Sequence, residues 1–270
     1  IEIFSGFEGL IEISKSNVDF MLNALVGSDG MKPSLIALEN NIVLGLANKE
    51  SMVMAGWLIK DILENNRSKI IPIDSEHNAI FQCLIGEKED NIKRIILTGS
   101  GGPFRTRDID TFDSVKLEEA LNHPNWEMGP KITIDSATMM NKGLEYIEAY
   151  WLFGLSVDKI DIVIHPQSFI HSMVEFVDGS MKAQLGEPNM KGPIQYALSY
   201  PSRIKNEIST FDFTKNNEFT FEPPDLNKFP CIKLAKEALS AGGSHQVVLN
   251  VSNDLVVDKF LNKKITFNDI

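Results

Sequence analysis

The sequence predicts an α/β protein. Short apolar runs alternate with segments whose apolar residues recur at helical spacing, and clusters of turn-forming residues separate the two. Alternation of strand and helix implies parallel strands joined by right-handed crossovers. The 270 residues are 43% hydrophobic and 23% charged, which is typical of a globular protein with a sizeable core.

The first seventy residues contain the clearest alternation. Asn48 stands where it can cap a helix, because it precedes a segment with helical apolar spacing. The expected elements are buried strands at 18–26, 42–47 and 70–73 and helices at 33–39 and 50–64.

The remainder of the chain predicts a second set of elements. Asp178-Gly179 lies between two alternating arms, which is a strong hairpin signal. The expected elements are strands at 94–98, 131–135 and 161–165, a helix at 136–153, a hairpin at 174–185, a polar linker at 202–225, and helices at 230–239 and 252–262.

Composition excludes several classes of protein. A net charge of −11 argues against a nucleic-acid-binding protein, which would carry a basic stripe. No apolar run is long enough to predict a membrane span, and the first residues do not resemble a targeting segment. Cys83 and Cys231 form no CxxC pair, so we expect a reducing compartment and no catalytic thiol.

Two carboxylates, Asp74 and Glu76, follow the predicted strand that ends at Ile73. Like charges at short range each raise the cost of ionising the other. A bound cation would relieve this repulsion, but solvent around an open acidic turn would relieve it too. Both interpretations stay open at this point.

The predicted helix after Asp135 carries further polar residues. Ser136 is expected at its N-cap, and Asn141, Lys142 and Glu145 fall on one face. A helix N-terminus with a hydroxyl and a nearby ammonium is a good anion site. The glycine-rich run 99–102 adds backbone amides. We therefore expect a phosphate cradle made of Ser100, Ser136, Asn141 and Lys142.

Glu145 is the candidate third ligand for a cation held by Asp74 and Glu76. Three carboxylates suit Mg²⁺ or Mn²⁺ better than zinc. The alternative is that Lys142 and Glu145 form an ordinary pair on the helix surface and that the two earlier acids lie in a solvated loop. The glycine-rich run alone decides nothing, because it does not fit GxGxxG.

Six longer motifs resemble one enzyme family, 1-deoxy-D-xylulose 5-phosphate reductoisomerase. They are ANKES at 47–51, DSEHNAIFQ at 74–82, LTGSGGPFR at 97–105, HPNWEMG at 123–129, IDSATMMNKGLEYIEA at 134–149 and HPQSFIHSMV at 165–174. The resemblance runs from about residue 18 to the end of the chain.

The resemblance implies a role for each matching residue. The metal ligands would be Asp74, Glu76 and Glu145, and the phosphate site would be Ser100, Ser136, Asn141 and Lys142. Other substrate-binding or catalytic groups would be Lys49, Ser75, Glu76 and His123, with Trp126 on a flexible flap and Ser168 and His171 as secondary pocket residues. The NADPH contacts would be Asn48, Glu50, Met128 and Gly129.

The resemblance also implies a reaction, a domain order and a setting. The reaction isomerises the sugar phosphate by retro-aldol cleavage and re-addition, and NADPH then reduces the branched product to 2-C-methyl-D-erythritol 4-phosphate for isoprenoid synthesis. We expect the second half of a Rossmann-like NADPH domain at 1–73, a catalytic domain at 74–201, a linker at 202–225 and the start of a helical C-terminal domain at 226–270. A homodimer in the bacterial cytoplasm is expected, with a plastid as the other possible location.

Two rival functions remain at this point. One is a metal-dependent sugar-phosphate isomerase without hydride transfer, and the other is a fragment that only binds. The second rests on a departure from the family, whose N-terminal glycine-rich NADPH motif and closing helices the sequence lacks. We therefore expect an internal fragment that is inactive alone.

Overall fold

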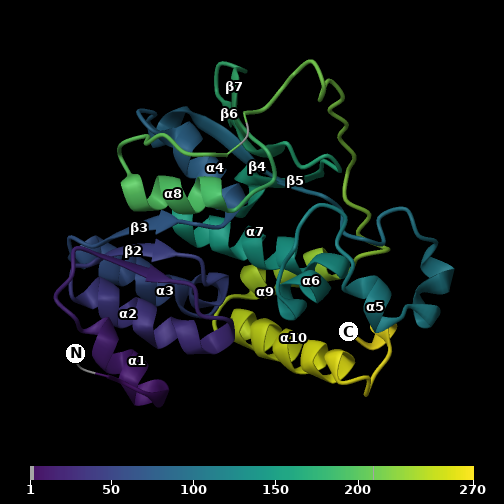
Figure 1. Cartoon of the computed structure of the whole chain (residues 1–270), viewed down its shortest axis with the longest axis horizontal. Coiled ribbons are helices and arrows are strands. Elements are labelled where there is room, and N and C mark those ends of the chain that lie inside the picture. The colour runs from purple at the N-terminus through teal and green to yellow at the C-terminus, as the bar shows by residue number, and fades with distance from the viewer. Residues whose placement is uncertain (1–2, 209) are drawn as a thin grey trace.

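A computed structural model describes residues 3–208 and 210–270 of the chain. Figure 1 shows its elements. The strands are β1 (Phe20–Asn23), β2 (Val43–Leu46), β3 (Lys69–Pro72), β4 (Ile92–Gly99), β5 (Ile160–Ile164), β6 (Ile170–Phe176) and β7 (Met181–Leu185). The helices are α1 (Gly6–Ser14), α2 (Met31–Glu39), α3 (Lys49–Asn65), α4 (Ser75–Leu84), α5 (Leu117–Ala120), α6 (Pro130–Ala137), α7 (Met140–Phe153), α8 (Lys191–Ser199), α9 (Cys231–Ala241) and α10 (His245–Leu261).

The first sheet consists of three parallel strands in the order β1-β2-β3. Helices α2 and α3 cover one face of it, and α8, which comes from much later in the chain, covers the other (Figure 1). Parallel sheets covered on both faces are typical of α/β proteins, because the connections between parallel strands place helices over the sheet.

The second sheet is mixed and has the order β5-β4-β6-β7. β4 pairs parallel with β5 and antiparallel with β6, and β6 and β7 form the hairpin that turns at Asp178-Gly179. Apolar residues of β4 and β6 pack against α4, α7 and α9 in the largest buried cluster.

Helix α7 lies between the two sheets and contacts α3 on one side and α9 on the other (Figure 1). The approach to α3 is close at Gly56, where an added Cβ would lie 2.2 Å from the ring of Trp151. A larger residue at position 56 would therefore push the two helices apart. This packing fixes α7, and with it the polar residues of its first two turns, relative to the first sheet.

The α/β fold class is confirmed, and most predicted elements are present. One expectation near the N-terminus needs correction: the first strand is shorter than 18–26, and Val18 and Val26 are exposed rather than buried. The alternative of an open acidic loop at 74–77 is excluded, because α4 begins at Ser75 with Asp74 as its N-cap. Helices α1, α4, α5 and α8 were not predicted.

The strand predicted at 131–135 is wrong. Residues Pro130–Ala137 form helix α6, with Pro130 at its first position. Ser136 is therefore near the C-terminal end of a helix and is not the N-cap of the next one. The chain reverses at Met139, which adopts a left-handed conformation with φ of 62°, and α7 starts at Met140.

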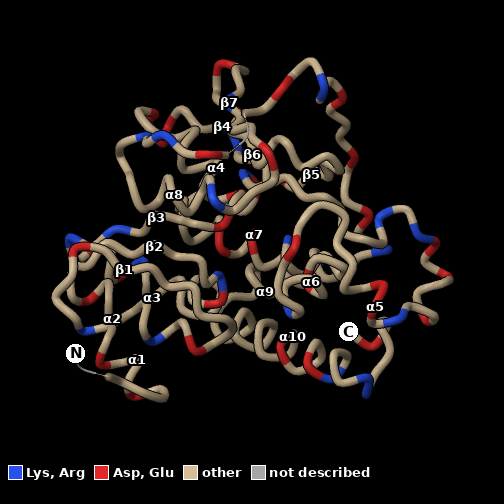
Figure 2. Tube along the Cα trace, viewed as in Figure 1, with Lys and Arg blue, Asp and Glu red and all other residues tan. Residues whose placement is uncertain are grey.

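Charged residues of both signs are interspersed along the trace (Figure 2). The net charge of −11 is therefore spread over the molecule. No helix among the described residues is long and apolar enough to cross a membrane.

Candidate active site

A cavity of about 210 Å³ opens beside the carboxyl ends of β3 and β4. Ligands of α/β proteins bind at such strand ends, where the loops converge. The predicted residues that line it are Lys49, Asp74, Ser75, Glu76, Ser100, His123, Trp126, Met128, Ser136, Asn141, Lys142, Glu145, Ser168 and His171. The fold thus brings residues from all six quoted motifs to one cavity.

Helix α4 presents the first two carboxylates. Oδ1 of Asp74 accepts a hydrogen bond from the backbone N–H of Glu76 at 3.2 Å, which satisfies one of the free donors at the start of the helix. Ser75 Oγ donates to Glu76 Oε2 at 2.6 Å. Both carboxylates are thereby held at a helix N-terminus, where negative charge is favoured.

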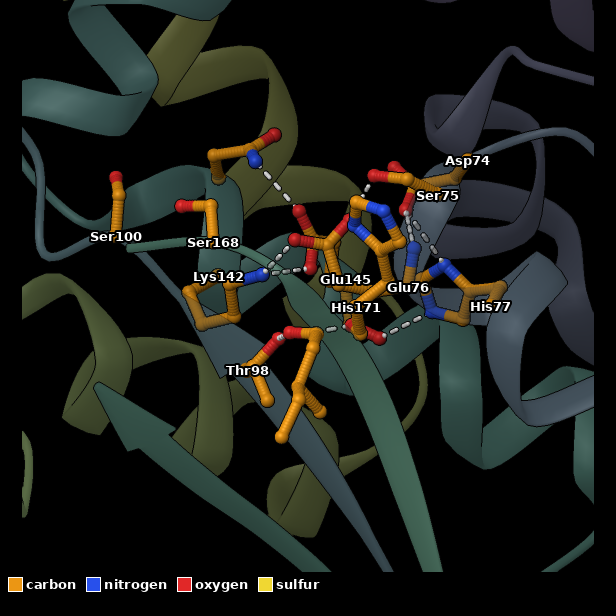
Figure 3. A network of polar contacts seen from close by, with 12 residues as sticks. Asp74, Ser75, Glu76, His77, Thr98, Ser100, Lys142, Glu145, Ser168 and His171 are labelled. Atoms are coloured by element: carbon orange, nitrogen blue, oxygen red, sulfur yellow. Dashed lines mark hydrogen bonds and ion pairs between the residues drawn. The ribbon is translucent and has the colours of Figure 1, made fainter. Parts of the chain in front are cut away.

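Helix α7 presents the third carboxylate together with an ammonium group. Glu145 is 1% exposed and Lys142 is 4% exposed, and the two side chains form an ion pair. Lys142 Nζ also lies 2.9 Å from Glu76 Oε1 (Figure 3). An ordinary surface pair on a helix is excluded by this burial.

Asp74, Glu76 and Glu145 each offer an oxygen within 4.8 Å of the others. Lys49 Nζ lies 3.0 Å from Asp74 Oδ2 and 3.6 Å from Glu145 Oε1, so two lysines face three carboxylates. One negative charge is left in excess. Burial, and next the charge of Glu76, raise the pKa of Glu145 to about 8.

This donor set fits a hard divalent cation. Three carboxylates from two elements converge on one point, and burial together with the neighbouring carboxylates makes it costly to ionise all three without a further positive charge. Carboxylate oxygens are the ligands that Mg²⁺ and Mn²⁺ prefer. Thiols and imidazoles are absent from this group of three, which does not suit zinc.

The glycine-rich run forms a tight loop against α6. Gly101 and Gly102 have φ of 85° and 70°, and a Cβ on Gly102 would lie 2.5 Å from the carbonyl oxygen of Ser136. Only glycine permits this approach. It brings Ser100 next to Ser136 although Ser136 caps no helix. The Lys142 stem runs beside Gly99, where an added Cβ would lie 2.9 Å from its Cε.

Residues 123–128, which we call the flap, cover one side of the cavity. His123 Nδ1 accepts hydrogen bonds from the backbone N–H groups of Asn125 and Trp126 at 3.1 and 3.0 Å. The ring proton is therefore on Nε2, which lies 3.2 Å from Ser100 Oγ and donates to it. Burial lowers the pKa of His123 to about 4, so the imidazole is neutral at physiological pH.

Two cavity residues other than glycine have left-handed backbones. Met139 has φ of 62° and Ser168 has φ of 56°. Backbone strain of this kind is concentrated at functional sites, where the surrounding structure holds it in place. Ser168 Oγ accepts a hydrogen bond from Asn125 Nδ2 at 2.8 Å, which ties the flap to the opposite wall.

Residues predicted to contact NADPH are divided between two places. Glu50 and Gly129 line a neighbouring cavity of about 250 Å³, which also touches Lys49 and Asn141. Asn48 lines neither cavity: its side chain accepts from Ser51 N–H and donates to the carbonyls of Leu25 and Gly27. Asn48 is 1% exposed, so a direct contact with NADPH is not supported by its position.

Sequence reasoning missed two polar residues next to the site. His77 and Glu148 are fully buried, and His77 Nδ1 lies 3.2 Å from Asp74 Oδ1 and 3.5 Å from Glu148 Oε2. Both residues are within the quoted motifs, and Glu148 is one helical turn from Glu145. That spacing was the available signal.

Three family models match the chain. Residues 1–56 match 1-deoxy-D-xylulose 5-phosphate reductoisomerase, residues 70–153 match the C-terminal domain of the same enzyme, and residues 185–270 match a DXP reductoisomerase C-terminal domain. The 1-deoxy-D-xylulose 5-phosphate reductoisomerase of Chloroherpeton thalassium is 55% identical over 271 residues, which cover 100% of this chain and 70% of that protein. The chain belongs to the 1-deoxy-D-xylulose 5-phosphate reductoisomerase family. The resemblance seen in the motifs is confirmed.

Other reductoisomerases agree with this assignment. The enzyme of Halothermothrix orenii is 52% identical over 270 residues and is covered to 70% of its length. A crystal structure of a DOX-P reductoisomerase with NADPH, fosmidomycin and magnesium matches 98% of this chain and 67% of that chain, with a TM-score of 0.94 and 47% identity. The Zymomonas mobilis reductoisomerase with NADPH matches with a TM-score of 0.91 and 45% identity.

Proposed function

We propose that the cavity between α4, α7 and the flap binds 1-deoxy-D-xylulose 5-phosphate and is where NADPH-dependent isomerisation and reduction to 2-C-methyl-D-erythritol 4-phosphate takes place. The observation that carries this proposal is one cavity in which three convergent carboxylates adjoin hydroxyl, amide and ammonium groups that suit a phosphate. A sugar phosphate needs both kinds of contact, because its reacting oxygens and its phosphate are at opposite ends of the molecule.

Asp74, Glu76 and Glu145 would hold the divalent cation. When bound, such an ion polarises a carbonyl and stabilises negative charge that develops on neighbouring oxygens. Lys49 reaches the same point and stays charged, because Asp74 and Glu145 outweigh the effect of burial and hold its pKa well above the ordinary value. It would therefore act as a fixed positive charge toward substrate oxygens.

Ser100, Ser136, Asn141 and Lys142 would receive the phosphate. Asn141 and Lys142 are in the first turn of α7 and line the cavity, so the partial positive charge of that helix end would favour an anion there. The hydroxyls and the amide would orient the phosphate, while Lys142 supplies the charge-assisted contact. Binding energy from this remote group would then be available to position the reacting carbons.

The neutral His123 would donate from Nε2 to a substrate oxygen once the substrate takes the place of Ser100 as its acceptor. The flap would exclude water, because Trp126 lies over the cavity next to His171 with 6.3 Å between ring centroids. Water exclusion strengthens every charge interaction within the site.

The neighbouring cavity at Glu50 and Gly129 would receive the nicotinamide end of NADPH. It adjoins the first cavity through Lys49 and Asn141, which line both. Met128 of the flap would separate the nicotinamide from bulk water. Reductoisomerases of known structure are complexes with NADPH and with magnesium, which favours hydride transfer over an isomerase without a reduction step.

The test is a spectrophotometric assay of the full-length protein, because the 270 residues alone are expected to be inactive. NADPH absorbance should fall when 1-deoxy-D-xylulose 5-phosphate and Mg²⁺ are both present, and a chelator should stop the change. Rearrangement of the substrate with no loss of NADPH absorbance would identify an isomerase instead. Binding of metal and substrate with no conversion at all would favour a binding-only chain.

Truncation of Trp126 to Ala should weaken substrate binding and turnover but leave the melting temperature nearly unchanged. The ring is part of a flap bounded by loop-forming residues and is not in a buried apolar cluster. A buried anchor would instead cost about 3–5 kcal/mol on truncation. Thermal melts measure the difference.

Two other tryptophans provide the scale for that measurement. Trp57 is 61% exposed, and Trp151 packs into the interface of α7 with α3 and donates to Gln246. The Trp126→Ala melt should resemble that of Trp57→Ala. A melt that falls as far as that of Trp151→Ala would refute the idea of a movable lid.

The domain division, the assembly and the location belong to the same proposal. Separate sheets in residues 20–72 and 92–185 support a boundary near residue 73, although α8 from the second segment packs on the first sheet; the boundary near residue 201 rests on the polar composition of the segment that follows it. We also propose a homodimer in the bacterial cytoplasm, and the sources of the relatives support a bacterial enzyme rather than a plastid one. Light scattering of the purified protein tests the dimer.

A further inference from the structure

A second polar group lies behind the three carboxylates, on the side away from the cavity. It consists of His77 and Glu148, both 0% exposed and neither among the residues that line the cavity. Buried ionisable groups are costly and are kept only where something compensates them. Neither residue has a part in the substrate, metal or NADPH binding proposed above.

His77 contacts both elements that carry the proposed metal ligands. Its Nδ1 faces Asp74 at the start of α4, and its Nε2 lies 2.9 Å from the backbone carbonyl oxygen of Glu145 in α7. Figure 3 shows the ring between Asp74 and the α7 backbone. Nε2 thus reaches α7, and Nδ1 approaches the start of α4 although it forms no hydrogen bond among the described residues, so the ring lies between the two elements.

Glu148 is the remaining neighbour of that ring. Its Oε2 lies 3.5 Å from His77 Nδ1, and neither of its oxygens has a hydrogen-bond partner among the described residues. Phe153 stacks on the face of the ring with 6.2 Å between centroids, which leaves the polar edge to the three acidic residues. The His77 ring is thus the polar side chain that lies against this fully buried carboxyl group.

We propose that Glu148 is a positioning residue that acts through His77 to set the geometry of Asp74 and Glu145. This rests on the proposed function, because it takes those two residues as ligands of the divalent cation. Ligating groups need outer partners to orient them, and loss of such a partner typically costs about 10–100-fold in metal affinity. Glu148 would hold the His77 ring in its place beside Asp74.

A second cation between Asp74, His77 and Glu148 is the competing explanation. These three residues also offer atoms within 4.8 Å of one another. The contact of Nε2 with the Glu145 carbonyl fits both explanations, because a ring held in this way could also bind a cation through Nδ1. The number of Mn²⁺ ions bound decides between them.

The test is calorimetric titration of the purified protein with Mn²⁺, without substrate. The parent should bind one ion. Glu148→Gln keeps the size of the side chain and removes its charge, and it should weaken Mn²⁺ binding by about 10–100-fold. NADPH affinity of the same variant should stay within about twofold of the parent.

A double-mutant cycle shows whether the effect passes through the ring. If Glu148 acts through His77, then the variant with both Glu148→Gln and His77→Gln should bind Mn²⁺ no more weakly than His77→Gln alone, within about twofold. Glu148→Asp keeps the carboxyl group on a shorter side chain and should bind Mn²⁺ more tightly than Glu148→Gln. It replaces Glu148→Gln in the comparison with the parent if the amide variant does not fold. Glu175→Gln removes a carboxylate of β6 that pairs with Arg94 and Lys93, and it should leave Mn²⁺ affinity unchanged.

Three results would overturn the inference. They are parental Mn²⁺ affinity in Glu148→Gln, additive losses in the double variant, and two bound ions of which Glu148→Gln loses only one. The last would assign the second cation site instead. If the parent binds no Mn²⁺, then the proposed metal site itself has failed, which distinguishes the two failures.

Discussion

Replacement of Glu145 by Gln should abolish metal-dependent turnover while the protein remains folded. The variant exchanges an anionic ligand for a neutral one of the same size. Charge stabilisation by a metal ion contributes several kcal/mol to such a reaction. Each 1.36 kcal/mol is a factor of ten in rate, so we expect a loss of about a thousandfold or more.

The melting temperature of Glu145→Gln, measured in the presence of a chelator, should stay close to that of the parent protein. Glu145 is buried next to Glu76 and Asp74, which raise its pKa, so loss of its charge removes repulsion as well as the contact with Lys142. Glu175→Gln is the matched control and should keep full activity. Near-normal turnover of Glu145→Gln at ordinary Mg²⁺ concentrations would remove Glu145 from the ligand set.

Replacement of Lys142 by Met should weaken binding of a phosphonate substrate analogue much more than binding of NADPH. The ammonium group lies at the start of α7 beside the glycine-rich loop, and Met keeps most of the side-chain length without the charge. A hydrogen bond to a charged group contributes roughly 1.5–3 kcal/mol. The expected loss in phosphonate affinity is therefore about 10–150-fold.

Binding should be measured at saturating Mg²⁺, because Lys142 also pairs with Glu76 and Glu145. Lys69→Met, at the exposed start of β3, is the control and should change neither affinity. An unchanged phosphonate affinity in Lys142→Met would mean that the phosphate lies elsewhere. Equal losses for phosphonate and NADPH would indicate a general distortion of the site.

The sequence predicted the sheet regions well because their signals are local. Apolar runs such as 42–47 are bounded by turn residues, and Asn48 caps α3 through Ser51 N–H as expected. The hairpin turn at Asp178-Gly179 is fixed by a glycine with φ of 83°. Signals of this kind do not depend on the rest of the fold.

Helix α6 was missed because its residues favour the wrong periodicity. Lys131 to Asp135 alternate polar and apolar side chains, with β-branched residues in the middle, as a strand would. The helix is only 8 residues long, and its start signal is Pro130 directly after Gly129. The break between α6 and α7 falls at Met139, which has a left-handed backbone. Glycine would have been the sequence signal for such a conformation, and it is absent here because tertiary packing holds the methionine in it.

The residues that line the cavity were predictable from the sequence, but their burial and electrostatics were not. The spacing along α7 indicated that Lys142 and Glu145 lie on the same face of the helix. Whether such a pair is exposed on the surface or buried in a site depends on the tertiary fold. Only the fold brings the start of α4 against α7. It likewise places Glu148, an acid in an otherwise apolar stretch, against His77.

Anomalous diffraction from a crystal of the protein soaked in Mn²⁺ tests the metal site most directly. The proposal predicts one strong peak at the cavity, with an oxygen from each of Asp74, Glu76 and Glu145 at about 2.1 Å. A peak centred on His77 and Glu148, or one that none of the three carboxylates touches, would contradict it.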